Sequence, residues 1–357
     1  MTLRIIDGFD YLPSSGISAV MQAQGWFGNT STVVRDSATA FGYGYSMGLS
    51  SNNNNDSLQR YMRNRYTGEC VIGMRMKIPS VGPGYSLSAI DSMTNGEQRQ
   101  WRLHFMENGN IDYITGNNTI VSRTGAGQYV PEKWFYLEIK WTPHLTTGSF
   151  ELRINTVPVL SLPSVQTAYG TLVGVGTRGW DTFEWWKSSI SGATNNWRWD
   201  DLYLLDDAGT VNNDYLGNVR AQYMAPVSDD VVQWIIGGTA PAATNWESVL
   251  NTALDDTKYV YESTVNDRDL YNINPVLNTP QVFGVEINAS YRQDDATQRF
   301  VSNSIKTASG VSSYGTSHAI NQSYTFYSDI FELNPDTGVA FTGAEVNTLK
   351  IGPRVDV

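Results

Sequence analysis

Short apolar runs, separated by residues that favour turns, recur along the whole 357-residue chain. Val71–Ile78 alternates between large apolar side chains and small or charged ones, which is the period of a half-buried β-strand. Trp101–Met106 and Ile111–Ile114 flank the dipeptide Asn108-Gly109, and this dipeptide is the strongest short signal for a β-hairpin. The pattern predicts an all-β fold of short antiparallel strands.

The chain is too long for one β-sandwich and suits two domains of roughly 100–200 residues each. Residues 206–214 are turn formers with little apolar surface to bury, so a linker is expected there. Leu216–Met224 has strand character, Trp246–Leu254 the pattern of a short helix, and Thr342–Val346 that of a helical turn. We expect a sandwich domain at residues 1–207, a linker at 208–216, and a second, smaller β-sandwich-like domain with one or two short helices at 217–357.

The charge balance excludes several classes of partner. The formal net charge is −11, and a surface this acidic repels phosphate backbones and anionic lipid headgroups. We therefore expect no nucleic-acid partner and no membrane partner. The single cysteine, Cys70, allows no intramolecular disulfide. Residues 1–10 lack the long apolar run of a signal peptide, which predicts a protein made in a cytoplasm.

One stretch resembles a known family. Trp134–Lys140, a turn at Gly148, and the strands Phe150–Asn155 and Val157–Leu160 resemble the central hairpin of concanavalin-like (laminin-G-like) jelly rolls. Residues 5–10 and 199–205 are similar to the first and last strands of that family. The resemblance implies a jelly-roll sandwich over about the first 205 residues, with its first and last strands side by side.

The chain also resembles virion proteins of tailed bacteriophages. The similar stretches are residues 206–219, 259–270 and 334–352. This resemblance implies a structural component of the virion, as a tail, fibre, collar or capsid-surface (decoration) protein. It would contact other virion proteins and itself as a homo-oligomer. A virion protein that is made in the host cytoplasm and released by lysis would need no signal peptide.

Catalytic residues are not recognisable in the sequence. Glycoside hydrolases of the jelly-roll fold place paired carboxylates along one strand, as Glu-x-Asp-x-(x)-Glu, to supply a nucleophile and an acid. Glu138 and Glu286 lie on expected strands without such a partner. His104, His144 and His318 are scattered, so their spacing does not suggest a zinc site. These absences predict a protein that is not an enzyme, with a polysaccharide-degrading enzyme as a less favoured alternative.

The aromatic segment from Trp180 to Trp186 is the best candidate for binding a ligand. Consecutive residues of a strand point to opposite faces, so one of Trp185 and Trp186 can face solvent. Such a ring could stack on a sugar, with Asp181 and Glu184 at the sugar's polar edge. The segment therefore suggests a receptor- or glycan-binding module for a host surface glycan. The alternative is that one ring packs in the core and the other in a subunit contact.

Calcium is a further possibility that the jelly-roll resemblance implies, since such domains often hold an ion near the first and last strands. Asp7, Asp10, Asp200 and Asp201 would supply the hard oxygen ligands that calcium prefers. The alternative is that these are ordinary aspartates of turns and strand ends. No other cofactor is expected.

Overall fold

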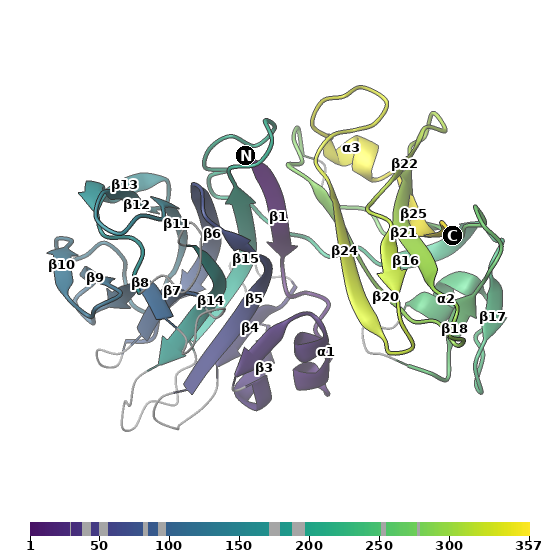
Figure 1. The fold of residues 1–357 in the computed structure, drawn as a ribbon, viewed down its shortest axis with the longest axis horizontal. Helices are drawn as coiled ribbons and strands as arrows, with labels where there is room; N and C mark the ends of the chain where they lie inside the picture. The colour runs from purple at the N-terminus through teal and green to yellow at the C-terminus, as the bar shows by residue number, and fades with distance from the viewer. Residues whose placement is uncertain are drawn as a thin grey trace. The chain divides into compact units, whose positions relative to one another are not determined.

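The structure is a computed structural model that describes residues 1–28, 30–37, 44–49, 56–80, 85–91, 98–170, 179–187, 197–250, 255–276 and 279–357. It divides into two compact units, Met1–Ala221 and Gln222–Val357 (Figure 1). Residues 208–221, most of which we expected to form a linker, are part of the first unit. The expected domain limits stay a prediction.

The first unit is built from two antiparallel sheets, as expected for a jelly-roll sandwich. The eight-stranded sheet has the order β13-β12-β11-β6-β15-β4-β3, with β1 also paired to β15. Its strands are β1 (Thr2–Asp7), β3 (Val33–Asp36), β4 (Ser46–Leu49), β6 (Cys70–Lys77), β11 (Trp134–Thr142), β12 (Gly148–Ile154), β13 (Val157–Val165) and β15 (Trp197–Asp206). The pairing of β1 with β15 confirms that the first and last strands lie side by side.

The second sheet has seven strands in the order β10-β9-β8-β7-β14-β5-β2. These strands are β2 (Trp26–Gly28), β5 (Asp56–Tyr66), β7 (Tyr85–Asp91), β8 (Gln98–Phe105), β9 (Ile111–Thr115), β10 (Ile120–Arg123) and β14 (Trp180–Lys187). The hairpin expected around Asn108-Gly109 is the β8–β9 pair. Gly109 adopts φ +81°, a left-handed conformation that a residue without a Cβ adopts at little cost.

Large aromatic side chains fill the space between the two sheets. Trp185 of the seven-stranded sheet stacks on Trp199 of the eight-stranded sheet, with ring centres 5.4 Å apart and planes inclined by 12°. Trp26 lies 5.1 Å from Trp185 on the other side. Aromatic rings of this size bury much apolar surface and gain from offset or edge contacts. The core therefore fixes which face of each strand points inward.

Two local features differ from the sequence-based expectations. A short helix, α1 (Ile17–Ala23), was not expected, and it has no side chain that caps its start. Leu216–Met224 forms no strand. Instead, the backbone N–H of Leu216 donates to the Tyr203 hydroxyl and that of Gly217 donates to Glu138. These bonds satisfy the backbone locally, in place of a strand partner.

The second unit is smaller and also β-rich. A six-stranded sheet contains β16 (Pro226–Val231), β19 (Leu270–Ile273), β25 (Lys350–Val355), β21 (Arg299–Lys306), β22 (Ser312–Tyr314) and β23 (His318–Ile320). Two ribbons pair β17 (Ile235–Gly237) with β18 (Tyr259–Tyr261) and β20 (Val285–Tyr291) with β24 (Thr325–Phe331). The ribbon of β20 and β24 shares a core with β19 and β21, through Val285, Phe331, Ile273 and Ile305.

Two short helices complete this unit, α2 (Asn245–Val249) and α3 (Gly343–Val346). Both were expected from the sequence, and Thr342 and Glu345 form a capping box at the start of α3. The all-β fold class is thus confirmed. Cys70, at the start of β6, is buried. Within the described residues, no helix has the length and apolar character needed to cross a membrane.

The core position of Trp185 leads to a first prediction. Trp185→Ala removes a ring that packs between Trp26 and Trp199, and it should lower the free energy of unfolding by about 3–5 kcal/mol. Trp186→Ala removes the same side chain from the opposite face of β14, where it is half-buried, and should cost clearly less. Urea denaturation of both variants measures the two losses. Equal losses would contradict the assignment of faces.

Candidate functional site

The outer face of the seven-stranded sheet, which points away from the core, carries the candidate site. On β14, Phe183 and Trp185 belong to the core. Glu184 and Trp186 alternate with them and therefore point outward. Glu184 pairs across the sheet with Ser88 of β7, and Trp186 pairs with Ser86. Cross-strand partners share a face of the sheet, so these side chains lie together.

The next strand extends this arrangement. Ser88 is opposite Arg102 of β8, and Ser86 is opposite His104. His104 is in turn opposite Asp112 of β9. We call this set of outward-pointing residues the polar face. It consists of Ser86, Ser88, Arg99, Arg102, His104, Asp112, Glu184 and Trp186.

The carboxylates of the polar face are neutralised by neighbours. Glu184 is almost fully buried and accepts a hydrogen bond of 2.8 Å from an Arg99 Nη and one of 3.0 Å from the Gln59 amide. Asp112 is held by two bonds from Arg123, at 2.5 and 2.8 Å. Charge-assisted bonds of this kind fix the side chains in one geometry. Both carboxylates are therefore occupied.

Arg102 has a different environment from Arg99 and Arg123. Within the described residues it forms no ion pair, and its buried Nε has no hydrogen-bond partner. Its guanidinium carbon lies 6.0 Å from the centre of the Trp186 ring, at the outer limit of a cation–π contact. Burial and the positive charge of Arg99 lower the pKa of Arg102, while Glu184 opposes this.

Several buried polar atoms of the polar face lack a hydrogen-bond partner in the part of the chain that the structure describes. They are the hydroxyls of Ser86 and Ser88, the Nε atoms of Arg99 and Arg102, and Nε2 of His104. Ser86 and Ser88 are both 0% exposed. Buried polar groups are normally bonded, and an unbonded group costs about 1–3 kcal/mol. Arg102 and His104 are partly exposed, so their unbonded nitrogens can be reached from outside, whereas the two serine hydroxyls are covered.

The surroundings of His104 disfavour its protonated form. Burial, followed by the positive charge of Arg102, lowers the pKa of His104 below its ordinary value of 6.5, although Asp112 acts in the opposite direction. The folded protein therefore binds fewer protons here than the unfolded chain does once the pH falls to about 6.5. This part of the stability is present at higher pH and is lost as the pH decreases below 6.5.

The pKa of His104 gives a second prediction. The free energy of unfolding of the wild-type protein should fall between pH 7.5 and pH 5, in part because of His104. In His104→Gln, which cannot be protonated, the fall should be smaller. Urea denaturation at several pH values measures both profiles. Identical pH dependence in the two proteins would contradict a depressed pKa.

The five residues that the sequence suggested for glycan binding do not all lie on the polar face. Trp180 and Trp185 are fully buried in the core. Asp181 is buried and accepts a 2.8 Å hydrogen bond from the Thr182 hydroxyl. Glu184 and Trp186 alone of the five belong to the polar face. The role of these residues in binding a glycan stays a prediction.

The contribution of β7 and β8 to the polar face was not expected from the sequence. Arg102 and His104 alternate with the core residues Trp101, Leu103 and Phe105, so their shared face was readable from the strand pattern. Their position beside Trp186 was not, because β14 lies far along the chain and its pairing with β7 is non-local. No local signal reports such a pairing.

The four aspartates expected at a calcium site have other partners. Asp7 forms a buried ion pair of 3.0 Å with Arg60. Asp201 forms one of 2.6 Å with Arg75 and also accepts the backbone N–H of Ala221. An arginine beside each carboxylate reduces the charge that would attract a cation.

Asp10 and Asp200 are bonded to the backbone. Asp10 accepts the N–H of Tyr45 at 2.6 Å, and Asp200 accepts that of Asp201 at 2.9 Å. Burial and the adjacent Asp201 raise the pKa of Asp200, which disfavours its charged form. Among the described residues, no group of three or more His, Cys, Asp or Glu side chains is arranged to hold a metal ion. The calcium site stays a prediction.

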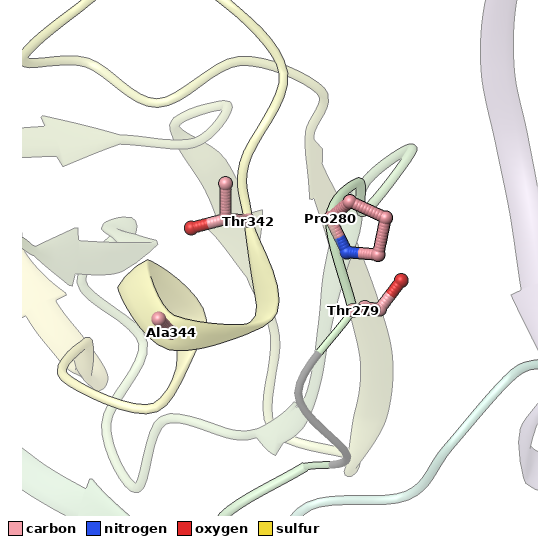
Figure 2. A pocket seen from close by; sticks show the side chains of 4 residues that line it. All are labelled: Thr279, Pro280, Thr342 and Ala344. Carbon is pink, nitrogen blue, oxygen red and sulfur yellow. The ribbon is translucent and has the colours of Figure 1, made fainter.

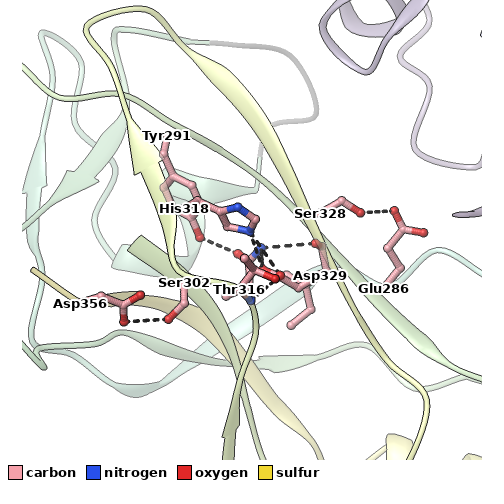
Figure 3. Close-up of polar contacts among 10 residues, drawn as sticks. Glu286, Tyr291, Ser302, Thr316, His318, Ser328, Asp329 and Asp356 are labelled. Carbon is pink, nitrogen blue, oxygen red and sulfur yellow. Dashed lines mark hydrogen bonds and ion pairs between the residues drawn. The ribbon is translucent and has the colours of Figure 1, made fainter. Parts of the chain in front are cut away.

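A second polar cluster lies in the second unit (Figure 3). Asp329 of β24 accepts hydrogen bonds from the Thr316 N–H at 2.8 Å, the Asn303 amide at 2.9 Å and Nε2 of His318 at 3.1 Å. The Tyr291 hydroxyl donates to Asn303 at 2.6 Å. Each member of this chain has a partner, so the cluster joins β20, β21, β23 and β24 as a structural network.

This network gives a third prediction. Asp329→Asn removes the carboxylate that accepts hydrogen bonds from Thr316, Asn303 and His318. It should lower the free energy of unfolding of the second unit by about 3 kcal/mol. Asp295→Asn, whose carboxylate is an exposed partner of Arg299 at 3.5 Å, is the control and should cost less than about 1 kcal/mol. Scanning calorimetry compares the two. A stable Asp329→Asn variant would show that the network is not structural.

A hollow of about 420 Å³ is also found in the second unit, lined by Thr279, Pro280, Thr342 and Ala344 (Figure 2). Among the described residues that line it, the polar side-chain groups are two threonine hydroxyls, and none is an acid, a base or a metal ligand. The chemistry of the first unit's polar face is richer, and the candidate site is placed there.

Comparison with known proteins gives no family. No protein-family model and no curated protein matches the sequence. Similar solved structures include a mutant of the alginate lyase Aly36B with an alginate trisaccharide, at TM-score 0.37 and 12% identity, covering 56% of this chain and 96% of that one. Trypanosoma rangeli sialidase is similar at TM-score 0.31 and 13% identity, over 45% of this chain and 25% of the sialidase. Sheep galectin-11 is similar at TM-score 0.28 and 9% identity, over 43% of this chain and all of the galectin.

These structures require one correction. The prediction that the chain is not an enzyme was wrong as stated, because the similar structures include an alginate lyase and a sialidase. The expectation rested on the absence of paired carboxylates along one strand and of histidines at zinc-ligand spacing. It did not cover an arginine, a histidine and one carboxylate brought together on one sheet by pairing of distant strands. None of these structures is a bacteriophage virion protein.

Proposed function

We propose that the polar face of the first unit binds a polysaccharide. The observation that carries the proposal is the half-buried Trp186 ring on the same face of a rigid sheet as Arg102 and His104, which are partly exposed and each have a nitrogen without a hydrogen-bond partner among the described residues. A sugar presents an apolar face of C–H groups and an edge of hydroxyls. An aromatic ring beside free hydrogen-bonding groups is complementary to both.

The sheet suits an extended ligand. β14 is paired along its length with β5 on one side and β7 on the other, so the backbone under Trp186 cannot easily move. Ser86 is much smaller than the Trp186 and His104 side chains that it lies between. A sugar residue bound over β7 would therefore contact large side chains on both sides. Little conformational entropy would be lost on binding, because the sheet is already ordered.

The fourth prediction tests binding. Trp186→Ala should weaken polysaccharide binding by about tenfold or more, as expected for loss of a central aromatic contact. Trp246→Ala, which removes a half-buried tryptophan from the second unit, is the matched control and should bind like the wild type. The measurement is binding to an array of neutral and acidic polysaccharides. Each polysaccharide that binds is then titrated to compare the affinities of the wild type and the variants.

The same samples should be incubated for hours and the chain length of the polysaccharide measured, since binding and cleavage are separate outcomes. Shortened chains would add an activity to the binding site. The absence of binding to every polysaccharide on the array would contradict the proposal. Equal loss of binding in Trp186→Ala and Trp246→Ala would place the site elsewhere.

We also propose a location for this binding. The stretches at residues 206–219, 259–270 and 334–352 resemble tailed-bacteriophage virion proteins, and on a virion surface a glycan-binding unit would meet host polysaccharide. The proposal rests on that sequence resemblance alone. It includes contacts with other virion proteins and with a second copy of this chain. Mass spectrometry of purified particles tests it, and absence of the protein from the particles would contradict it.

A further inference from the structure

Among the described residues of the polar face, the two carboxylates are paired with arginines, but one arginine has no carboxylate partner. Glu184 is bonded to Arg99 and Asp112 to Arg123, so these charges cancel in pairs. Arg102 lies between the two pairs on β8 and has no carboxylate partner among the described residues. A half-buried guanidinium without a counter-ion is uncommon, because the charge loses hydration and gains no compensating bond.

We propose that the ligand of the polar face is an acidic polysaccharide, and that Arg102 binds a carboxylate carried by the sugar stacked on Trp186. The inference rests on the proposed function and adds two points: the charge of the ligand and the residue that binds this charge. A guanidinium is the side-chain group best suited to a carboxylate, because its planar N–H donors match the two oxygens.

Arg102 and Trp186 are close enough to contact the same sugar. The Arg102 guanidinium carbon lies over the Trp186 ring, 6.0 Å from the ring centre, so a sugar that packs on the exposed part of the ring lies beside the guanidinium. A pyranose placed against Trp186 would therefore bring a ring carboxylate within reach of Arg102. The hydroxyls of Ser86 and Ser88 lie on β7, between the strands that carry Trp186 and Arg102.

The local electrostatics agree with this assignment. The whole chain is acidic, with a net charge of −11, so a polyanion would be repelled by most of its surface. Among the described residues, however, the polar face and Arg123 bring three arginines beside two carboxylates, Glu184 and Asp112. Burial lowers the pKa of Arg102 most, Arg99 lowers it further, and Glu184 opposes this.

The fifth prediction compares matched ligands and matched variants of the full chain. The ligands are polygalacturonate, alginate and hyaluronan, each beside its carboxyl-reduced form, which keeps the backbone and removes the charge. The wild-type protein should bind at least one acidic polymer and bind its reduced form about tenfold or more weakly. Raising the salt concentration should weaken binding of the acidic polymer, because screening reduces the attraction.

The variants test separately whether binding depends on the positive charge at position 102 and on the planar shape of the guanidinium. Arg102→Gln should weaken binding of the acidic polymer by about 10- to 100-fold, the range for a charged hydrogen bond, and leave the reduced polymer unaffected. Arg102→Lys keeps the charge but lacks the planar pair of donors, so its affinity for the acidic polymer should lie between those of the wild type and Arg102→Gln. Arg292→Gln in the second unit changes the net charge equally and should bind like the wild type. Thermal unfolding of each variant verifies that it is folded.

The outcomes distinguish the two proposals. Binding of neutral polysaccharides or of the reduced polymers as tightly as the acidic ones, with loss in Trp186→Ala, would overturn the acidic ligand and leave the glycan site in place. Binding of an acidic polymer that Arg102→Gln does not change would overturn the role of Arg102. No binding to any neutral or acidic polymer would overturn both proposals.

Discussion

The stack of Trp185 on Trp199 is the contact on which the candidate site depends. It joins the two sheets of the first unit and fixes the inward face of β14. Because side chains alternate along a strand, the same contact turns Glu184 and Trp186 outward. A shift of one residue in β14 would exchange the core ring and the surface ring, and the core would then have to bury Glu184. The position of the polar face is thus set by packing on the other side of the sheet.

Across the sheet, the pairing register decides which residues meet. Ser86 and Ser88 are small, and they lie between strands that carry large polar and aromatic side chains. Two of the three arginines near this row are bound to carboxylates, which leaves Arg102 as the distinctive charge. Burial and the arginine neighbours lower the pKa of His104, while Asp112 opposes them. Among the described residues, the face therefore combines an aromatic ring, a histidine and one arginine without a carboxylate partner, within a protein that is acidic as a whole.

Much of the fold was predictable from local pattern. The β8–β9 and β11–β12–β13 hairpins follow from alternation and turn residues, and the β1–β15 pairing agrees with the jelly-roll resemblance. The helix α1 was not predictable because it has no capping side chain, and Leu216–Met224 failed as a strand because its N–H groups bond to side chains of the sheet. The site was predictable only at Glu184 and Trp186. Its other members come from β7 and β8, whose pairing with β14 depends on contacts distant in the sequence.

The central claim is that the outer face of the seven-stranded sheet binds a polysaccharide. Hydroxyl-radical footprinting with and without a bound acidic polymer tests it most directly, because the method reports the solvent exposure of individual side chains. The bound polymer should protect Trp186 and His104 and leave the oxidation rate of Trp246 unchanged. Protection confined to the second unit or to the eight-stranded sheet, with Trp186 and His104 still oxidised at their original rates, would contradict it.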